Sequence, residues 1–141
     1  DEIWVSGPQV VRSYLNAADN IGTKVLADGQ IWHRTGDAGC WDTQGRLWLW
    51  GRHAAGCQGT YPFQVEIPAQ QLPSVRKAAF VCVDNHGILA LEGQRGPLPD
   101  WTQRWHVVWL RQIPLDARHG SKVDYPRLRA LLSPHLTRQT Q

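Results

Sequence analysis

The sequence predicts an α+β fold, with a small β-rich first portion followed by a compact portion of mixed helices and strands. Short apolar segments separated by turn residues fill residues 1–50, a pattern typical of antiparallel strands. Small residues replace apolar ones at 51–56, which indicates a linker. From there to residue 141, helix-like and strand-like spacings are mixed. A chain of 141 residues is long enough for one domain or for two small units.

The N-terminal portion reads mainly as short strands. A strand is predicted at 2–5, ended by a Ser-Gly-Pro segment, and one or two helical turns are predicted at 9–15. A turn at 27–30 precedes a second strand at 31–34, and Thr-Gly-Asp at 35–37 is interpreted as a polar turn.

A hairpin is predicted at residues 40–50, around the turn segment 42–45. It contains three of the chain's eight tryptophans, Trp41, Trp48 and Trp50. Because an indole buries a large area, we expect this cluster to pack structurally, with a nucleic-acid stacking surface as the alternative.

The C-terminal portion begins with a helix expected within 62–72, kinked or split by Pro68. Strands are predicted at 78–83, 87–91 and 106–110, the first two joined by a turn. A last helix follows, with Asp124 as its N-cap and Pro126 in its first turn. The residues expected on one face of this helix are Leu128, Leu131 and Leu132.

Composition narrows the possible partners. Hydrophobic residues make up 42% of the chain and charged residues 19%, which excludes a disordered protein. The net charge of +3 comes from scattered Lys and Arg, and this weak basicity suits an anionic small ligand as well as nucleic acid. Of the two, our prediction is a small ligand and no nucleic acid. The longest apolar runs are too short to span a bilayer, so no membrane span is expected.

The three cysteines, Cys40, Cys57 and Cys82, have no metal-type pair spacing, and neither do the six histidines. An odd number of cysteines without a signal peptide predicts free thiols in a reducing compartment, and therefore a cytoplasmic location. The chain opens in mid-pattern without Met, so we expect a piece of a longer protein.

Three local patterns occur in a specific order along nearly the whole chain. The first is Glu-Ile-Trp-Val-Ser-Gly-Pro-Gln-Val-Val-Arg-Ser-Tyr-Leu at 2–15, and the second is Arg-Thr-Gly-Asp at 34–37, followed by two Gly-Arg pairs at 45–46 and 51–52. The third is Ile-Pro-Leu-Asp at 113–116, leading to Lys-Val-Asp at 122–124. This ordered set resembles the C-terminal part of the adenylate-forming enzymes, the superfamily of acyl-CoA synthetases, peptide-synthetase adenylation domains and luciferase.

The resemblance implies roles for three residues. Asp37 matches the family aspartate that binds the ribose hydroxyls of the nucleotide, and a carboxylate forms strong hydrogen bonds of this kind. Arg52 matches an arginine that contacts ribose or phosphate, with a guanidinium suited to anions. Lys122 matches the mobile catalytic lysine, which stabilises the negative charge that develops when a carboxylate attacks the α-phosphate of ATP.

The resemblance also implies an organisation and a reaction. Residues 1–51 correspond to the C-terminal β subdomain of the large adenylating domain, 52–56 to a hinge, and 57–141 to the C-terminal lid. The implied enzyme is an acid-activating ligase that uses ATP and Mg²⁺ to form an acyl-adenylate. The acyl group then passes to an acceptor such as CoA or a carrier-protein phosphopantetheine thiol. The adenine and acyl sites lie in the missing N-terminal domain of the same enzyme, so we expect this chain alone to be inactive.

Departures from the family pattern keep two alternatives open. Ala54 replaces a polar hinge residue, the segment between Arg52 and Pro62 is shorter than usual, and the lysine loop at 118–122 is one residue longer. Its sequence is closer to the loop of β-lactone synthetases. One alternative is therefore a variant member that forms β-lactones, and the other is a non-catalytic partner-binding module with a Trp-rich face.

Overall fold

Two separate sheets organise this chain, one in each of two units. The computed structural model describes residues 1–118 and 120–137, and it divides into Asp1–Ala54 and Ala55–Gln141. The predicted α+β class is confirmed, because strands and helices are both present. Among the described residues, no helix is long and apolar enough to cross a membrane.

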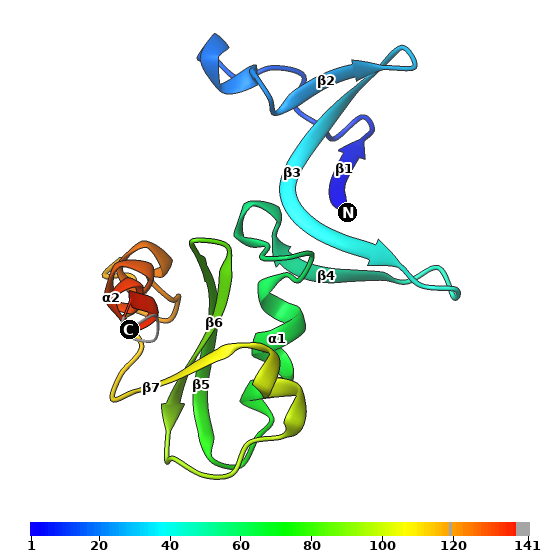
Figure 1. The fold of residues 1–141 in the computed structure, drawn as a ribbon. Coiled ribbons are helices and arrows are strands. Elements are labelled where there is room, and N and C mark those ends of the chain that lie inside the picture. The colour runs from blue at the N-terminus through cyan, green and yellow to red at the C-terminus, as the bar shows by residue number, and fades with distance from the viewer. Residues whose placement is uncertain (119, 138–141) are drawn as a thin grey trace. The chain divides into compact units, whose positions relative to one another are not determined.

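The first unit is an antiparallel sheet built around one long strand, β3 (Gln30–Trp41). Residues 30–38 of β3 pair with β1 (Glu2–Ser6) and β2 (Lys24–Ala27), and residues 37–41 pair with β4 (Leu47–Arg52) (Figure 1). The predicted strand at 2–5 and the predicted hairpin at 40–50 are thereby confirmed.

Strand β3 corrects the interpretation of residues 35–37 as a turn. These residues lie inside the strand, and Asp37 pairs with Arg52 of β4. The strand then bulges between Ala38 and Gly39. A side chain at Gly39 would meet the Trp48 carbonyl oxygen at 2.5 Å, so only glycine lets the two strands approach so closely.

The helical turns predicted at 9–15 are absent, which corrects that expectation. A short 3-10 helix, η1 (Ala17–Asn20), follows instead, capped by the Asn16 side chain. The Asn20 side-chain oxygen accepts a hydrogen bond from the Tyr14 backbone N–H at 2.7 Å. A side chain therefore satisfies a backbone donor that a helix would have used.

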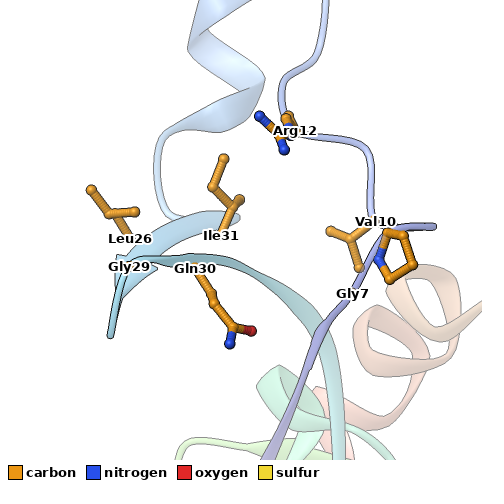
Figure 2. A pocket seen from close by; sticks show the side chains of 8 residues that line it. Gly7, Val10, Arg12, Leu26, Gly29, Gln30 and Ile31 are labelled. Atoms are coloured by element: carbon orange, nitrogen blue, oxygen red, sulfur yellow. The ribbon is translucent and has the colours of Figure 1, made fainter.

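The first unit has a shallow hollow between the segment after β1 and the β2–β3 turn (Figure 2). Arg12, Leu26 and Ile31 are among the side chains that border it, and none of the predicted site residues contributes to its lining.

The tryptophans of the β3–β4 hairpin do not pack as expected within this chain. Trp41 and Trp48 are 69% and 53% exposed, and the Trp48 indole N–H donates to Asp42 at 2.8 Å. The prediction of a packed cluster was wrong for these two residues because a single-layer sheet of this size offers no opposing apolar face.

The second unit is a three-layer arrangement around a three-stranded sheet. Strands β5 (Val75–Val83) and β6 (His86–Gly93) form an antiparallel hairpin, and β7 (His106–Leu110) pairs with β6 in parallel. The parallel connection from β6 to β7 contains a 3-10 helix, η3 (Asp100–Arg104). These three strands confirm the strands predicted at 78–83, 87–91 and 106–110.

Helices α1 (Pro62–Gln70) and α2 (Tyr125–Thr137) cover opposite faces of this sheet (Figure 1). Alternate residues of a strand face opposite sides, so Phe80 packs with α1 and its neighbour Val81 with α2. Both faces are apolar, which explains why β5 and β6 read as continuous hydrophobic runs.

Two details of the helices differ from expectation. Helix α1 is continuous through Pro68, because this proline lies in its last turn and removes few internal hydrogen bonds. Asp124 caps α2 as predicted, accepting from the Arg127 N–H at 3.0 Å. Leu128 and Leu132 are fully buried, whereas Leu131 is 48% exposed, so two of the three leucines expected on one face enter the core.

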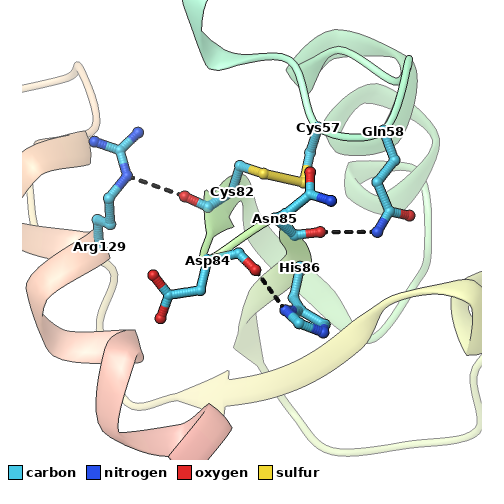
Figure 3. The surroundings of a disulfide bond; sticks show 7 residues. All are labelled: Cys57, Gln58, Cys82, Asp84, Asn85, His86 and Arg129. Atoms are coloured by element: carbon cyan, nitrogen blue, oxygen red, sulfur yellow. Dashed lines mark hydrogen bonds between the residues drawn. A yellow bond between two sulfur atoms is a disulfide. The ribbon is translucent and has the colours of Figure 1, made fainter.

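A disulfide joins Cys57 to Cys82, which corrects the prediction that all three cysteines are free (Figure 3). The two cysteines are 25 residues apart, and the fold brings their Cα atoms to 5.3 Å. Close by, the Gln58 side-chain amide donates to the Asn85 carbonyl at 2.8 Å. The segment that follows the linker is thus attached to the β5–β6 hairpin, while Cys40 in the first unit is a free thiol.

Candidate functional site

The predicted nucleotide residues Asp37 and Arg52 lie side by side, because the β3–β4 register makes them direct partners. Arg52 Nη1 is 2.9 Å from Asp37 Oδ1. The same nitrogen donates to the Thr35 carbonyl at 3.2 Å. Two motifs that are 15 residues apart in sequence therefore form one polar cluster.

Thr35 and Gly36 determine the backbone geometry and the space around this cluster. The Thr35 hydroxyl donates to the Ile3 carbonyl at 2.8 Å and accepts from the Asp37 N–H at 3.1 Å. Gly36 has a φ of 73°, and a side chain there would lie 3.1 Å from the Arg52 guanidinium. Glycine therefore provides both the unusual backbone conformation and the space for the arginine.

The Asp37–Arg52 pair is open to solvent. The Arg52 side chain is 69% exposed and the Asp37 side chain 33% exposed. Exposed ion pairs contribute little stability, so a ligand can take over either partner at small cost. The carboxylate can accept hydrogen bonds from two neighbouring hydroxyls, and the guanidinium can donate to an anion.

Lys122 lies in the second unit, in a loop between β7 and α2. An isolated bridge between Leu115 and Val123 closes this loop. The Asp116 N–H donates to the Lys122 carbonyl at 2.8 Å, and the Asp124 N–H donates to the Pro114 carbonyl at 2.9 Å. The Lys122 side chain is exposed, so the loop fixes its backbone and leaves the ammonium accessible.

The structure therefore brings Asp37 and Arg52 together and places Lys122 in the other unit. The unit boundary falls between Ala54 and Ala55, within the segment 52–56 that was predicted as a hinge. This segment includes the end of β4 and a short 3-10 helix, η2 (His53–Ala55). His119, beside the lysine in sequence, lies outside the described residues.

Two buried acidic residues support the second unit and were not identified from the sequence. Burial raises the pKa of Glu66, although hydrogen bonds from the Phe80 N–H and the Tyr125 hydroxyl oppose this effect. Burial also acts to raise the pKa of Glu92, but the Ile113 N–H and Arg76 outweigh it and leave that pKa below its usual value. The only sequence signal was an acidic residue within an apolar segment.

Metal ligands are not grouped in the described part of the chain. It contains no cluster of three or more His, Cys, Asp or Glu side chains that could hold a metal ion. We therefore identify no site for Mg²⁺ among the described residues.

Comparison with curated proteins finds several relatives, some of which match this chain along nearly its whole length. It is 31% identical to the olefin beta-lactone synthetase of Stenotrophomonas maltophilia, over 98% of this chain and 30% of that protein. It is 30% identical to the phenyloxazoline synthase MbtB of Mycobacterium tuberculosis, over 97% of this chain and 11% of that protein. An indoleacetate–CoA ligase of Aromatoleum aromaticum is 37% identical over 57% of this chain and 16% of its own length. No protein-family model matches the chain.

Solved structures with the same fold include IdnL7, with a TM-score of 0.72 and 28% identity over 95% of this chain and 28% of that one. The amide bond synthetase McbA from Marinactinospora thermotolerans has a TM-score of 0.66 and 26% identity, covering 92% of this chain and 30% of its own. The O-succinylbenzoate coenzyme A synthetase MenE from Bacillus subtilis, solved with AMP, has a TM-score of 0.64 and 25% identity, covering 93% and 29%. The chain thus spans 30% or less of the length of each protein compared.

Proposed function

We propose that this chain, whose relatives and structural neighbours are adenylate-forming enzymes, serves as the C-terminal portion of an ATP-dependent ligase that activates a carboxylic acid. In the complete ligase, the carboxylate attacks the α-phosphate of ATP, pyrophosphate leaves, and an acyl-adenylate forms. An acceptor, such as the thiol of CoA or of a carrier-protein phosphopantetheine, then displaces AMP.

The observation that carries this proposal is the joining of Thr-Gly-Asp and Gly-Arg into one solvent-open cluster by the β3–β4 register. A ribose with two neighbouring hydroxyls matches the acceptor capacity of Asp37. A nucleotide phosphate, or a ribose oxygen, matches the donors of Arg52. We assign both residues to nucleotide binding.

We assign catalysis to Lys122. Negative charge accumulates where the substrate carboxylate approaches the α-phosphate, and an ammonium group placed there lowers the energy of the transition state. In this proposal the lid (57–141) moves about the hinge (52–56), delivers Lys122 for adenylation and then rotates for the second step.

The complete ligase also requires the rest of the large domain, which we propose as the main partner of this chain. The exposed apolar residues Trp41, Leu47 and Leu49 lie on one face of the β3–β4 hairpin and provide an apolar surface for such a contact. Mg²⁺ enters as the ion that accompanies ATP, and we assign it no ligand in this chain.

A cytoplasmic location remains a prediction. The Cys57–Cys82 disulfide argues against it, because disulfides persist mainly in oxidising compartments. Cell fractionation combined with rapid thiol alkylation decides it. Recovery of the protein outside the cytoplasm would contradict the prediction.

The experiment that tests the function is ATP–pyrophosphate exchange by the protein that includes this chain and the region upstream of it. We expect Lys122→Ala to lower exchange by about 10²–10³-fold while leaving ATP binding largely intact. The isolated 141-residue chain should show no exchange. Exchange by the isolated chain, or unchanged exchange in Lys122→Ala, contradicts the proposal.

A second candidate is a variant ligase that forms β-lactones, favoured by the match to an olefin beta-lactone synthetase. There, the β-hydroxyl of the activated acid attacks its own acyl-adenylate, AMP leaves, and the ring closes. AMP release from a 3-hydroxy acid without any thiol acceptor would favour this candidate over thioester formation.

The exposure of Trp41 and Trp48 also suits a non-catalytic module that binds a partner protein. The upstream sequence discriminates: a phosphate-binding loop followed by an aromatic adenine motif favours the ligase, and the absence of both favours the module.

A further inference from the structure

Two glutamates with buried side chains lie in the second unit without belonging to any of the sequence motifs. Glu66 of α1 is 5% exposed and Glu92 of β6 is 6% exposed. A buried carboxylate is costly unless hydrogen bonds replace the lost water. One hydrogen-bond partner of each carboxylate lies at an end of the loop that carries Lys122: Ile113 for Glu92 and Tyr125 for Glu66.

Glu92 holds the beginning of the loop. Its Oε2 accepts a hydrogen bond from the Ile113 N–H at 2.6 Å, and its Oε1 accepts from Arg76 Nε at 2.8 Å. Ile113 is fully buried and immediately precedes Pro114, the first residue of the hydrogen-bonded loop. The entry to the loop is thus attached to β6.

Glu66 holds the end of the loop. Its Oε1 accepts from the Tyr125 hydroxyl at 2.8 Å and from the Phe80 N–H at 2.7 Å. Tyr125 is the first residue of α2 and follows Lys122 by three positions. One carboxylate oxygen therefore connects α1, β5 and the start of α2.

Backbone hydrogen bonds transmit this attachment to the lysine. The Asp116–Lys122 and Asp124–Pro114 bonds join the two sides of the loop between the anchors. A lysine side chain is long and flexible, so the position of its backbone limits where the ammonium can reach. A displacement of about 1 Å can reduce a catalytic rate roughly 100-fold.

We propose that Glu66 and Tyr125 are positioning residues for Lys122: their hydrogen bond, together with the Glu92–Ile113 bond, fixes the base of the lysine loop to the lid core. The proposal rests on the proposed function of Lys122, but its structural part can be measured without any activity.

The structural test is hydrogen exchange in the 141-residue chain. Tyr125→Phe removes the hydroxyl and retains the ring. We expect the amides of Asp116 and Asp124 to exchange roughly tenfold faster, the factor for loss of one such hydrogen bond. Ser133→Ala is the matched control, because it also removes a hydroxyl from α2. The Ser133 hydroxyl donates to the Arg129 carbonyl. Unchanged exchange of both amides in Tyr125→Phe would overturn the proposal.

The functional test is a double-mutant cycle in the ligase that includes the upstream region. Tyr125→Phe should lower the kcat of adenylation roughly tenfold with the KM for ATP unchanged. In a Lys122→Ala background, the same substitution should cause no further loss, because it acts through the lysine. An equal loss in both backgrounds means a general structural role and overturns the proposal. If Lys122→Ala itself has no effect on adenylation, the proposed function fails. The hydrogen-exchange result then tests the structural part of the proposal by itself.

Discussion

Arg52 Nη1 lies 2.9 Å from Asp37 Oδ1, so the two residues assigned to nucleotide binding are bonded to each other. The arginine also donates to the Thr35 carbonyl, which keeps its guanidinium over Gly36. Each residue thereby helps to orient the other, and preorganisation of this kind reduces the entropy lost on binding.

Replacing Arg52 should weaken nucleotide binding and leave the free energy of unfolding almost unchanged. In the complete ligase, we expect Arg52→Ala to weaken ATP binding about tenfold, because it removes a charge-assisted donor. The free energy of unfolding should change by less than about 1 kcal/mol, since the ion pair is exposed. Titration calorimetry and chemical denaturation measure the two effects.

Arg46→Ala is the matched control for that experiment. Arg46 forms an exposed ion pair with Asp42 at 2.7 Å in the same hairpin, outside the proposed site. An equal loss of ATP affinity in both variants would contradict the assignment of Arg52.

The Asp42 carboxyl should have an unusually low pKa. A hydrogen bond from the Trp48 indole, followed by backbone and side-chain bonds from Arg46, lowers its pKa from 3.8 to about 2. Because the folded pKa is depressed, the stabilising contribution of this carboxylate is complete above pH 3.8 and is lost as the pH falls through about 2. NMR titration of the carboxyl carbon checks the midpoint.

Trp48→Phe removes the first of those hydrogen bonds and should move the Asp42 midpoint upward. A midpoint that stays near 2 in this variant would show that the indole does not cause the shift.

Glu66 should make the second unit less stable as the pH rises. Its folded pKa lies above the usual 4.5, chiefly through burial, so the folded state binds more protons than the unfolded state in that range. The free energy of unfolding therefore decreases as the pH rises from 4.5 through the elevated pKa. Denaturation at a series of pH values should show this decrease, and Glu66→Gln should flatten it.

Glu92 should have the opposite effect on the pH dependence of stability, because its folded pKa is lowered. Its contribution is present above pH 4.5 and is lost as the pH falls through the depressed value. If Glu92→Gln and Glu66→Gln altered the pH dependence in the same direction, the assigned shifts would be wrong.

The Cys57–Cys82 bond should stabilise the second unit alone. Closing a segment with a sequence separation of 25 residues restricts the unfolded chain and contributes about 3.5 kcal/mol at 25 °C. Cys82→Ser, or reduction, should lower the thermal midpoint of that unit. In Cys40→Ser, a reductant should still produce the full decrease, because Cys40 is not part of the bond. Thermal unfolding with and without reductant makes the comparison, and insensitivity of the original chain to reductant would contradict it.

Local sequence patterns predicted much of the fold. Apolar segments bounded by turns located β5, β6 and β7, and Asp124 marked the start of α2, because these signals depend on neighbouring residues. The turn assigned to 35–37 was wrong, because strand pairing with β1 and β4 overrides the turn preference of a Gly-Asp pair.

The sequence by itself determined the α+β class, the order of the motifs and the identity of Asp37, Arg52 and Lys122 as candidates. Tertiary structure alone decided that Asp37 contacts Arg52, that Cys57 bonds to Cys82, and that Glu66 reaches Tyr125 across 59 residues. The physical reason is that each of these contacts joins residues far apart in the chain. Strand register and helix packing set the distance between such residues, and no local pattern encodes it.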